Sequence, residues 1–219
     1  MKKNLIFIIS FCLTLLVILS QPACLRTETP LLYEKGSFPD SLIALTDINS
    51  AYDDYNITYY ELSDIFPVVF SSSRGSSGGQ YDLVQGAIAY SFDKTNGSFI
   101  LMAGLSSDGY FEQLLTKSNT AGNDFGPYRL YSPLDGNEYM ILSSVSENDD
   151  LDFFYTKNTP YFGTTIPEIF GPYPATIFNS GSDDAYICFD TDQDSAYFSR
   201  NVDGNFDICI HSKPLLTGW

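Results

Sequence analysis

The stretch Ala196-Tyr197-Phe198-Ser199-Arg200-Asn201, followed by Asp203-Gly204-Asn205-Phe206-Asp207-Ile208, decides the fold class of this chain. An apolar strand that ends in small polar residues leads through an Asp-Gly turn into an aromatic residue, an acid and an apolar residue. The pattern recurs upstream, from Val68 to Leu83 and from Phe99 to Glu112. Such internal repetition is typical of repeat architectures.

Short runs of aromatic and β-branched residues, separated by Asn-Gly, Asp-Gly and Gly-Gly, fill the chain after residue 40 and predict antiparallel strands with almost no helix. Central strands align at four residues spaced close to the ~40–45 residues of a four-stranded propeller blade, namely Phe70, Leu101, Phe154 and Phe198. We therefore expect an all-β fold, a β-propeller of four-stranded antiparallel blades. Its recognisable units are about 48–84, 85–119, 125–168 and 170–213.

A second repeat predicts where the units join. Phe125-Gly126-Pro127-Tyr128 returns 45 residues later as Phe170-Gly171-Pro172-Tyr173. Four blades are few for a propeller, and the chain stops at Trp219 where a linker into another blade is expected, so the array is expected to be incomplete. The alternative is a genuine four- or five-bladed ring in which a strand from Ser41 to Ser50 closes against the last blade.

The last unit, AYFSRNVDGNFDICI, resembles the WD40-like repeat of TolB-type β-propellers, and the resemblance extends from about Ile48 to Ser212. The resemblance implies a radial array of four-stranded sheets. It also implies an exported bacterial protein that binds other proteins or components of the cell envelope. Physical reasoning agrees on the architecture, because stacked blades bury apolar strand faces that no single blade could bury alone.

The N-terminus predicts export. A basic start is followed by an apolar run, Leu5 to Leu19, that is shorter than the ~20 residues of a membrane-spanning helix. Cys24 follows Ala23 directly, where a bacterial lipoprotein signal places its lipid-accepting cysteine, although Gln21 departs from that pattern. We expect lipid attachment at Cys24; ordinary signal cleavage and a free thiol are the alternatives.

These features divide the chain into a signal peptide (1–23), a tether (24–39) and the propeller repeats (40–219). Cleavage before Cys24 would remove two lysines and no acid, changing the formal charge from −16 to −18. So acidic a protein is not expected to bind nucleic acid or anionic headgroups, and only a lipid anchor would hold it at a membrane. We expect an outer-membrane lipoprotein that faces the periplasm or the cell surface.

Two cysteines remain in the repeats. Cys188 and Cys209 are expected on the second and fourth strands of one blade, ~9–10 Å apart, which is too far for a disulfide. We expect both to be buried as small hydrophobic residues.

The alternate carboxylates of Asp190, Asp192 and Asp194 have the opening spacing of a calcium loop. Ser195 stands where such a loop needs glycine, and Asn201 stands where it needs glutamate. A solvated hairpin turn is therefore the preferred interpretation. The same interpretation applies to a second group, Asp149, Asp150 and Asp152.

No catalytic group stands out. His211 is the only histidine, no serine lies in a Gly-x-Ser-x-Gly elbow, and the glycines at Ser76-Ser77-Gly78-Gly79 lack a following Gly-Lys-Ser/Thr. We therefore expect a loop between strands there, and His211 at a surface or sheet edge. The abundance of Tyr and Phe is compatible with a sugar-stacking platform, but blade packing explains it better.

The expected function is therefore non-catalytic. We expect an exported binding or scaffold module that presents a propeller face to a protein or glycan of the bacterial cell envelope, with no cofactor and no metal. The alternatives are a propeller glycoside hydrolase or lyase, or a peptidase-associated domain, with carboxylates in the central channel, and a structural module stabilised by calcium.

Overall fold

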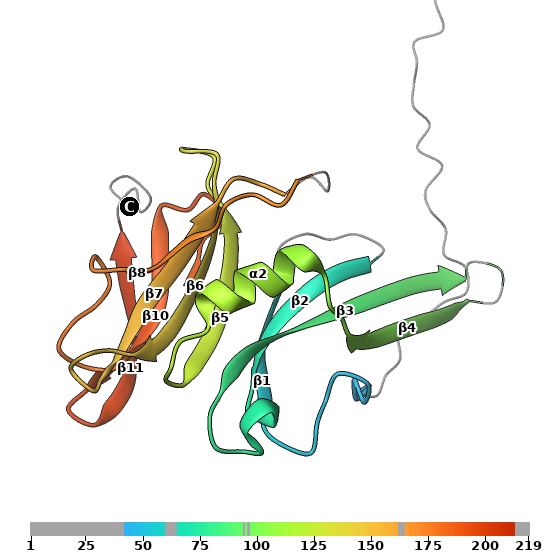
Figure 1. The fold of residues 1–219 in the computed structure, drawn as a ribbon, viewed down its shortest axis with the longest axis horizontal. Coiled ribbons are helices and arrows are strands. Elements are labelled where there is room, and N and C mark those ends of the chain that lie inside the picture. The colour runs from blue at the N-terminus through green and yellow to red at the C-terminus, as the bar shows by residue number, and fades with distance from the viewer. Residues whose placement is uncertain (1–41, 60–64, 94, 96, 162–164, 213–219) are drawn as a thin grey trace, which may run out of the picture. The chain divides into compact units, whose positions relative to one another are not determined.

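The computed structural model describes residues 42–59, 65–93, 95, 97–161 and 165–212, which form three consecutive antiparallel sheets (Figure 1). The first contains β1 (Asp54–Tyr59), β2 (Ile65–Ser72), β3 (Asp82–Asp93) and β4 (Ser98–Leu105). The second contains β5 (Asp124–Tyr131), β6 (Glu138–Val145), β7 (Leu151–Asn158) and β8 (Phe170–Pro174). The third contains β9 (Asp184–Phe189), β10 (Ser195–Val202) and β11 (Asn205–Ser212). The all-β expectation is confirmed.

The division into units differs from the one expected. The expected units 48–84 and 85–119 contribute to one sheet, because β2 pairs with β3 along eight residues and β3 pairs onward with β4. The Phe125 to Tyr128 and Phe170 to Tyr173 repeats lie in the first and last strands of the second sheet, so the later repeat does not mark a junction. When strands are equally apolar, their local sequence does not show whether two of them are neighbours in one sheet or equivalent strands of two different sheets.

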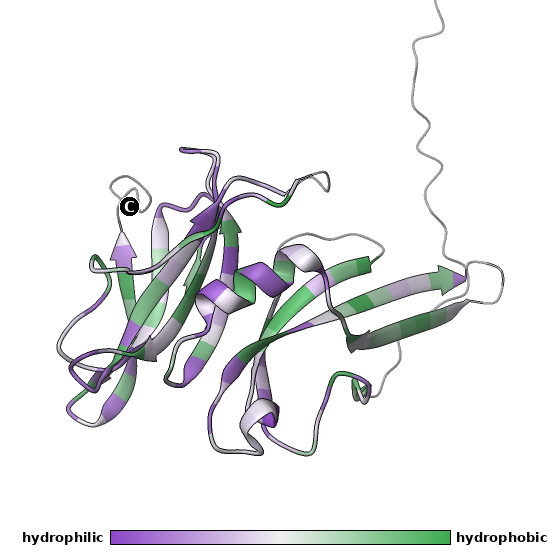
Figure 2. Ribbon diagram, in the orientation of Figure 1, coloured by the Kyte–Doolittle hydropathy of each residue, from purple (hydrophilic) through white to green (hydrophobic). Residues whose placement is uncertain are grey.

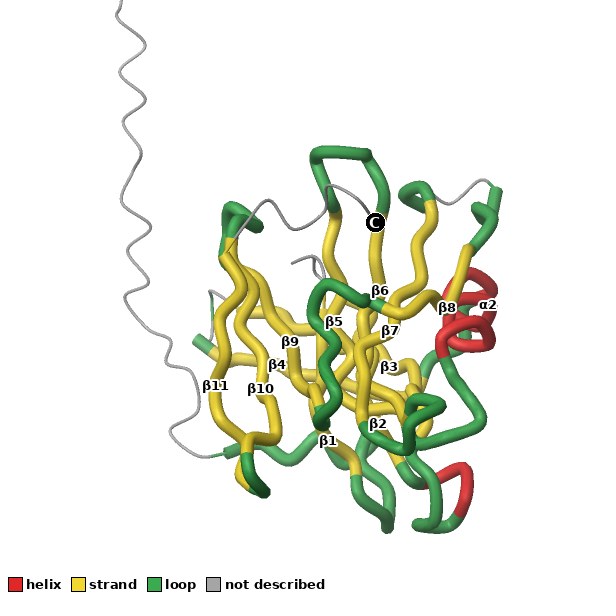
Figure 3. The backbone as a smooth tube through the Cα atoms, turned by 90° about the vertical axis from the view of Figure 1, so that its left-hand side faces the viewer, coloured by secondary structure: helices red, strands yellow, loops and turns green. Residues whose placement is uncertain are grey.

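An α-helix, α2 (Gly109–Ser118), stands where the repeat predicted a strand. The Asp108 side chain accepts hydrogen bonds from the backbone N–H groups of Tyr110 and Phe111 and so caps the first turn. Tyr110, Phe111, Leu114 and Ser118 form its buried face at helical spacing. Figure 3 shows α2 beside β8, which it contacts. Within the described ranges no helix is both long and apolar enough to span a bilayer.

Two apolar cores join consecutive sheets. Between the first and second sheets, Leu83 of β3 and Leu142 of β6 pack with Leu114 of α2. Between the second and third sheets, Phe153 of β7 contacts Phe178 and Phe198 edge to face, with ring centroids 6.2 and 5.7 Å apart. The short strands thus bury their apolar faces against the next sheet, as the repeat pattern predicted.

A polar loop is repeated before the first strand of each sheet. It reads Asn-Ser-Ala-Tyr-Asp-Asp at 49–54, Asn-Thr-Ala-Gly-Asn-Asp at 119–124 and Asn-Ser-Gly-Ser-Asp-Asp at 179–184. In each loop the backbone N–H of the second residue donates to the carboxylate of the last, at 2.6 to 2.8 Å. These three acids, Asp54, Asp124 and Asp184, therefore occupy equivalent positions, 70 and 60 residues apart.

The three acids, of which Asp124 and Asp184 are fully buried, differ in their cationic partners. Arg74 lies 2.6 Å from Asp54, and Arg200 lies 2.6 Å from Asp184, whereas the hydrogen bonds to Asp124 come from the uncharged Thr120 and Ser144. Burial acts to raise the pKa of Asp54, but hydrogen bonds from Arg74, Ser72 and Ser50 outweigh it and lower that pKa to about 2.

The pKa of Asp124 moves the other way. Burial raises it to about 6, against the hydrogen bonds from Thr120 and Ser144. The environment of this loop position therefore lowers the pKa of the acid in one loop, at Asp54, and raises it in another, at Asp124.

The first strand of each sheet bulges two residues after this acid. Asn56, Gly126 and Tyr186 each have positive φ, between 55° and 59°, and the strand register shifts at each of them. The ring of Tyr186 lies against Gly126, where an added Cβ would approach within 2.9 Å of it. The bulge and the polar loop together define one structural repeat per sheet.

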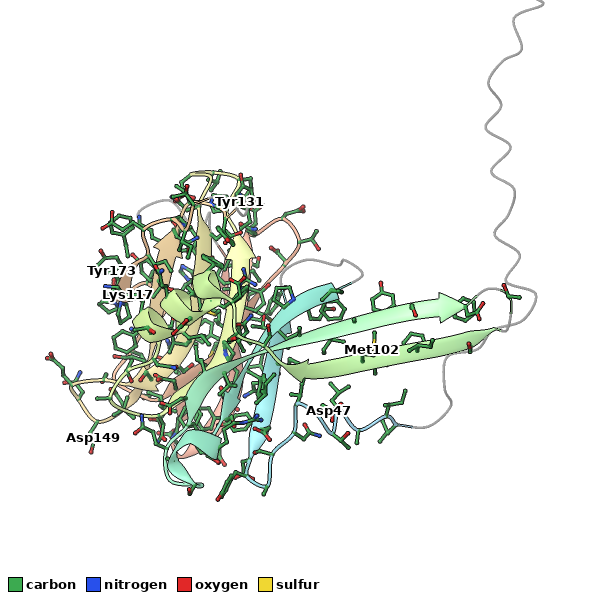
Figure 4. The ribbon with its side chains drawn as sticks, turned by 45° about the vertical axis from the view of Figure 1, so that its right-hand side comes forward. Asp47, Met102, Lys117, Tyr131, Asp149 and Tyr173 are labelled. Carbon is green, nitrogen blue, oxygen red and sulfur yellow. The ribbon has the colours of Figure 1, made fainter. Side chains whose placement is uncertain are left out.

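The described part of the segment Ser41 to Ser50 is not a strand. Residues 46–48 form a turn, and Ile48 packs on Phe70 and Val68 of the first sheet, so it does not close against the last sheet. The β3–β4 hairpin extends away from the sheets that follow it, with Met102 exposed on β4, a strand that is apolar along most of its length (Figures 2 and 4).

Candidate binding site

A pocket of about 1020 Å³ opens where segments of all three sheets meet α2. The ends of β1, β5 and β9, the start of β6, the first turn of α2 and the turn after β9 contribute to its wall. Seven of its fifteen lining residues are aromatic: Tyr59, Tyr110, Phe111, Tyr128, Tyr131, Tyr161 and Phe189. Concave sites of this size with convergent polar groups are typical of ligand binding.

Tyr110 anchors the inner wall. Its ring stacks on Tyr161 with centroids 4.7 Å apart, and its hydroxyl donates to Glu138 Oε2 at 2.8 Å. Asn158 Nδ2 donates to the Tyr110 hydroxyl at 3.1 Å. Burial, together with the nearby Glu138 carboxylate, raises the pKa of Tyr110 well above its usual range, so the phenol remains protonated and serves as a hydrogen-bond donor.

A largely buried ion pair lies beside this tyrosine. Arg129 Nη2 is 3.8 Å from Glu138 Oε2, and the guanidinium lies over the Phe111 ring at 4.7 Å. The face of the ring attracts the guanidinium, and the carboxylate balances its charge. The pocket therefore offers a fixed donor plane and a fixed acceptor next to apolar ring faces.

The outer wall is formed by β5 and the turn after β9. Tyr128 stacks on Phe189 with centroids 5.7 Å apart, and Gln193 Nε2 donates to the backbone carbonyl of Tyr131 at 2.6 Å. The side chain of Tyr131 is exposed at the end of the second sheet opposite to Asp149 (Figure 4). This wall therefore presents accessible aromatic surface at the pocket mouth.

Most of the acidic groups singled out in the sequence lie in turns, but Asp152, expected in a turn, lies on β7, where it pairs with Ser144. Asp190 Oδ1 accepts hydrogen bonds from the backbone N–H groups of Asp194 and Ser195, so it closes the β9–β10 hairpin. Asp149 and Asp150 belong to the β6–β7 turn, where the Ser146 hydroxyl donates to Asp150. The described residues contain no group of three or more His, Cys, Asp or Glu side chains placed to hold a metal ion. The hairpin interpretation of Asp190 to Asp194 is confirmed.

The two cysteines lie on strands separated by one other strand, as expected, but on the first and third strands of their sheet and not on the second and fourth. Cys188 on β9 and Cys209 on β11 are separated by β10 and form no disulfide. Cys209 packs against the core of the second and third sheets, whereas Cys188 is exposed, which corrects the expectation that both are buried. The strand alternation places Cys188 on the outer face of the third sheet, opposite Tyr197.

His211 lies on β11 as expected and is partly covered, since its ring meets Phe178 edge to face at 5.6 Å. The segment 76–79 is part of the connection from β2 to β3, where the Ser76 hydroxyl accepts hydrogen bonds from the N–H groups of Gly79 and Gln80. Cys24, the signal peptide and the tether lie outside the described residues.

Sequence reasoning did not find the pocket, because its wall draws on segments between Tyr59 and Gln193 that only the folded sheets bring together. One signal was accessible: Asp108, followed by apolar residues at helical spacing, marks the start of α2 and hence places Tyr110 and Phe111 side by side. No protein-family model, no characterised protein and no solved structure matches this chain.

Proposed function

We propose that the protein is a non-catalytic binding module whose sheets are β-propeller blades and whose aromatic pocket takes a glycan of the bacterial cell envelope. The observation that carries the proposal is the pocket itself, with stacked tyrosines beside the Arg129 and Glu138 pair. A sugar ring has apolar C–H faces and a polar hydroxyl edge. Aromatic faces match the former, and a fixed guanidinium and carboxylate match the latter.

The propeller arrangement is supported by contacts among the first strands. β1 contacts β5 and β5 contacts β9, as expected when the first strand of each blade lies nearest a common axis. The structural repeat of polar loop and bulge adds to this support, because it occurs once per sheet.

Titration of the full chain with soluble peptidoglycan fragments and with lipopolysaccharide core oligosaccharide tests the proposal. We expect one of these glycans to bind, and we expect Tyr131→Ala and Tyr161→Ala each to weaken its affinity ~10-fold, which corresponds to about 1.4 kcal/mol. Tyr173→Ala is the matched control, since Tyr173 is an exposed tyrosine on β8 that does not line the pocket. Equal affinity in all four proteins, or no binding to either glycan, would refute the proposal.

A glycoside hydrolase is the second candidate, because two carboxylates, Glu138 and Asp190, line the same pocket. Both already serve as structural acceptors, Glu138 for Tyr110 and Asp190 for its own turn, which favours binding over acid–base chemistry. New reducing ends released in the titration, and lost in Glu138→Gln, would select the hydrolase.

The proposal places this module at the envelope through export and lipid attachment at Cys24. A single acyl-bearing cysteine at the start of a tether would leave the repeats free to reach their ligand. We expect Cys24→Ser to shift the protein from the membrane to the soluble fraction of cells. An unchanged membrane fraction would rule out the anchor.

A further inference from the structure

The polar loop that begins each sheet also clamps the sheet before it. At the junction of the first and second sheets, Asn119 Oδ1 accepts from the backbone N–H of Leu83 at 2.7 Å, and its Nδ2 donates to the carbonyl of Leu83 at 3.2 Å. At the next junction Asn179 does the same to Phe153, at 2.8 and 3.0 Å. One asparagine thus satisfies both polar groups of one residue on the third strand of the preceding sheet.

A second residue of the loop repeats this behaviour. Asn123 Oδ1 accepts from the backbone N–H of Tyr81 at 2.9 Å, and Asp183 Oδ1 accepts from that of Leu151 at 3.0 Å. Each acceptor lies directly before the buried acid of its loop. The two junctions are therefore the same interface, made twice.

The first loop has this clamp, but none of the described sheets precedes it. Asn49 and Asp53 occupy the positions of the clamping residues, and both side chains are exposed. Among the described residues, the Asn49 side chain makes no hydrogen bond, and the Asp53 carboxylate accepts only from the Tyr81 hydroxyl. On the adjoining β1, Ile57 and Tyr59 are also exposed, whereas their counterparts on β9 are buried in the junction core.

The last sheet has the complementary surface, but within the described residues no loop follows it. Ile208 on β11 corresponds to Leu83 on β3 and Phe153 on β7, because each pairs with a serine of the preceding strand. Leu83 and Phe153 are 2% and 0% exposed, and Ile208 is 85% exposed. Phe206 and Ile210 lie on the same face of β11 and are exposed as well. An apolar sheet face of this kind marks an interaction surface.

We propose that a second copy of this chain covers this face, with its loop 49–54 clamped on β11 as loops 119–124 and 179–184 are clamped within the chain. Asn49 of the second copy binds the backbone of Ile208, and its Asp53 accepts from the N–H of Phe206. Ile57 and Tyr59 then cover the apolar face. The inference rests on the blade arrangement proposed above; it shares Tyr59 with the rim of the pocket but does not need the glycan.

The number of copies follows from ring closure. A head-to-tail contact either closes into a ring or grows into a filament. Known propellers have about four to eight blades, so the three sheets described in one copy do not make a ring, whereas two copies supply six and three copies supply nine. The two copies therefore form a reciprocal dimer, with both junctions made.

Analytical ultracentrifugation of the full chain in mild detergent, across concentrations from low to high micromolar, tests the inference. We expect a dimer for the wild type, and monomers for Ile208→Asp and for Ile57→Asp, each with an unchanged circular dichroism spectrum, since both side chains are exposed in a single copy. A 1:1 mixture of these two variants retains one intact junction and re-forms a dimer. Met102→Asp, a change at an exposed residue of β4, should remain dimeric.

Each other outcome contradicts the inference. A wild type that stays monomeric at every concentration leaves β11 without a second copy. A dimer that survives Ile57→Asp but not Ile208→Asp pairs β11 with β11, and species larger than a dimer exclude ring closure. The assay contains no glycan, so its result is separate from that of the binding proposal.

Discussion

Replacing Arg200 with methionine is expected to lower the free energy of unfolding by ~3–5 kcal/mol at neutral pH. Arg200 Nε lies 2.6 Å from Asp184 Oδ1, and its Nη2 donates to the backbone carbonyl of Phe178 at 2.6 Å. Asp184 is fully buried, so the variant leaves a carboxylate without its cation inside the protein. Methionine keeps much of the packing over the Phe198 ring, which the guanidinium covers at 5.2 Å.

Urea unfolding at pH 7 measures this loss. Lys117→Met is the matched control, because it removes a cation from the surface of α2 (Figure 4) and is expected to change stability by less than ~0.5 kcal/mol. The double variant Arg200→Met/Asp184→Asn removes the stranded charge and should recover much of the lost stability. A single variant within ~1 kcal/mol of the wild type would show that the ion pair does not hold the third sheet.

Asp124 is expected to give the protein a pH dependence of the opposite sign to that of a salt-bridged acid. Its pKa of about 6 in the folded protein exceeds the ~3.9 of an unfolded chain, so the folded state binds the proton more tightly. The resulting stabilisation is complete below pH ~4 and is lost as the pH rises through 6. Two pKa units correspond to ~3 kcal/mol.

The comparison of wild type with Asp124→Asn isolates this effect. The amide can accept from the Thr120 N–H and donate to the Thr120 hydroxyl, which now bond the carboxylate at 2.8 and 3.0 Å. We expect the variant to gain ~2–3 kcal/mol relative to wild type between pH 4 and pH 7, measured by urea unfolding. Asp47→Asn, at an exposed acid, should follow the wild type throughout. Parallel curves for Asp124→Asn and wild type would contradict the assignment.

The strand content could be predicted from the sequence because it depends on local pattern. Runs of aromatic and β-branched residues and the spacing around Asp190 predicted the right local structure, whereas Asp108-Gly109, expected as a turn into a strand, begins α2. Phe70 and Phe198 indeed occupy equivalent positions, two residues before the partners of Asp54 and Asp184. The local sequence pattern could not predict which strands belong to the same sheet. Leu101 is an outer-strand residue of the same sheet as Phe70, because pairing between strands is a non-local property.

The polar residues would have aligned the repeats of this chain more reliably than the apolar strands did. The loops ending in Asp54, Asp124 and Asp184 repeat once per sheet, whereas apolar strands repeat several times within each sheet and blur the period. Their buried carboxylates must be hydrogen-bonded, so their neighbours are more constrained than the apolar positions, where several residues of similar volume fit. The pocket stayed hidden for the reason that its aromatic residues look like core in sequence.

The clamp made by Asn119 and Asn179 has a consequence for how such a chain can change in evolution. Each sheet begins with the loop that clamps the sheet before it and contains the third strand that the next loop clamps. Both parts are encoded within 60–70 consecutive residues. Duplicating or deleting one such sheet with its loop leaves the residues at every remaining junction between sheets chemically complementary. The length of the array can therefore vary in whole-sheet steps without the invention of a new interface.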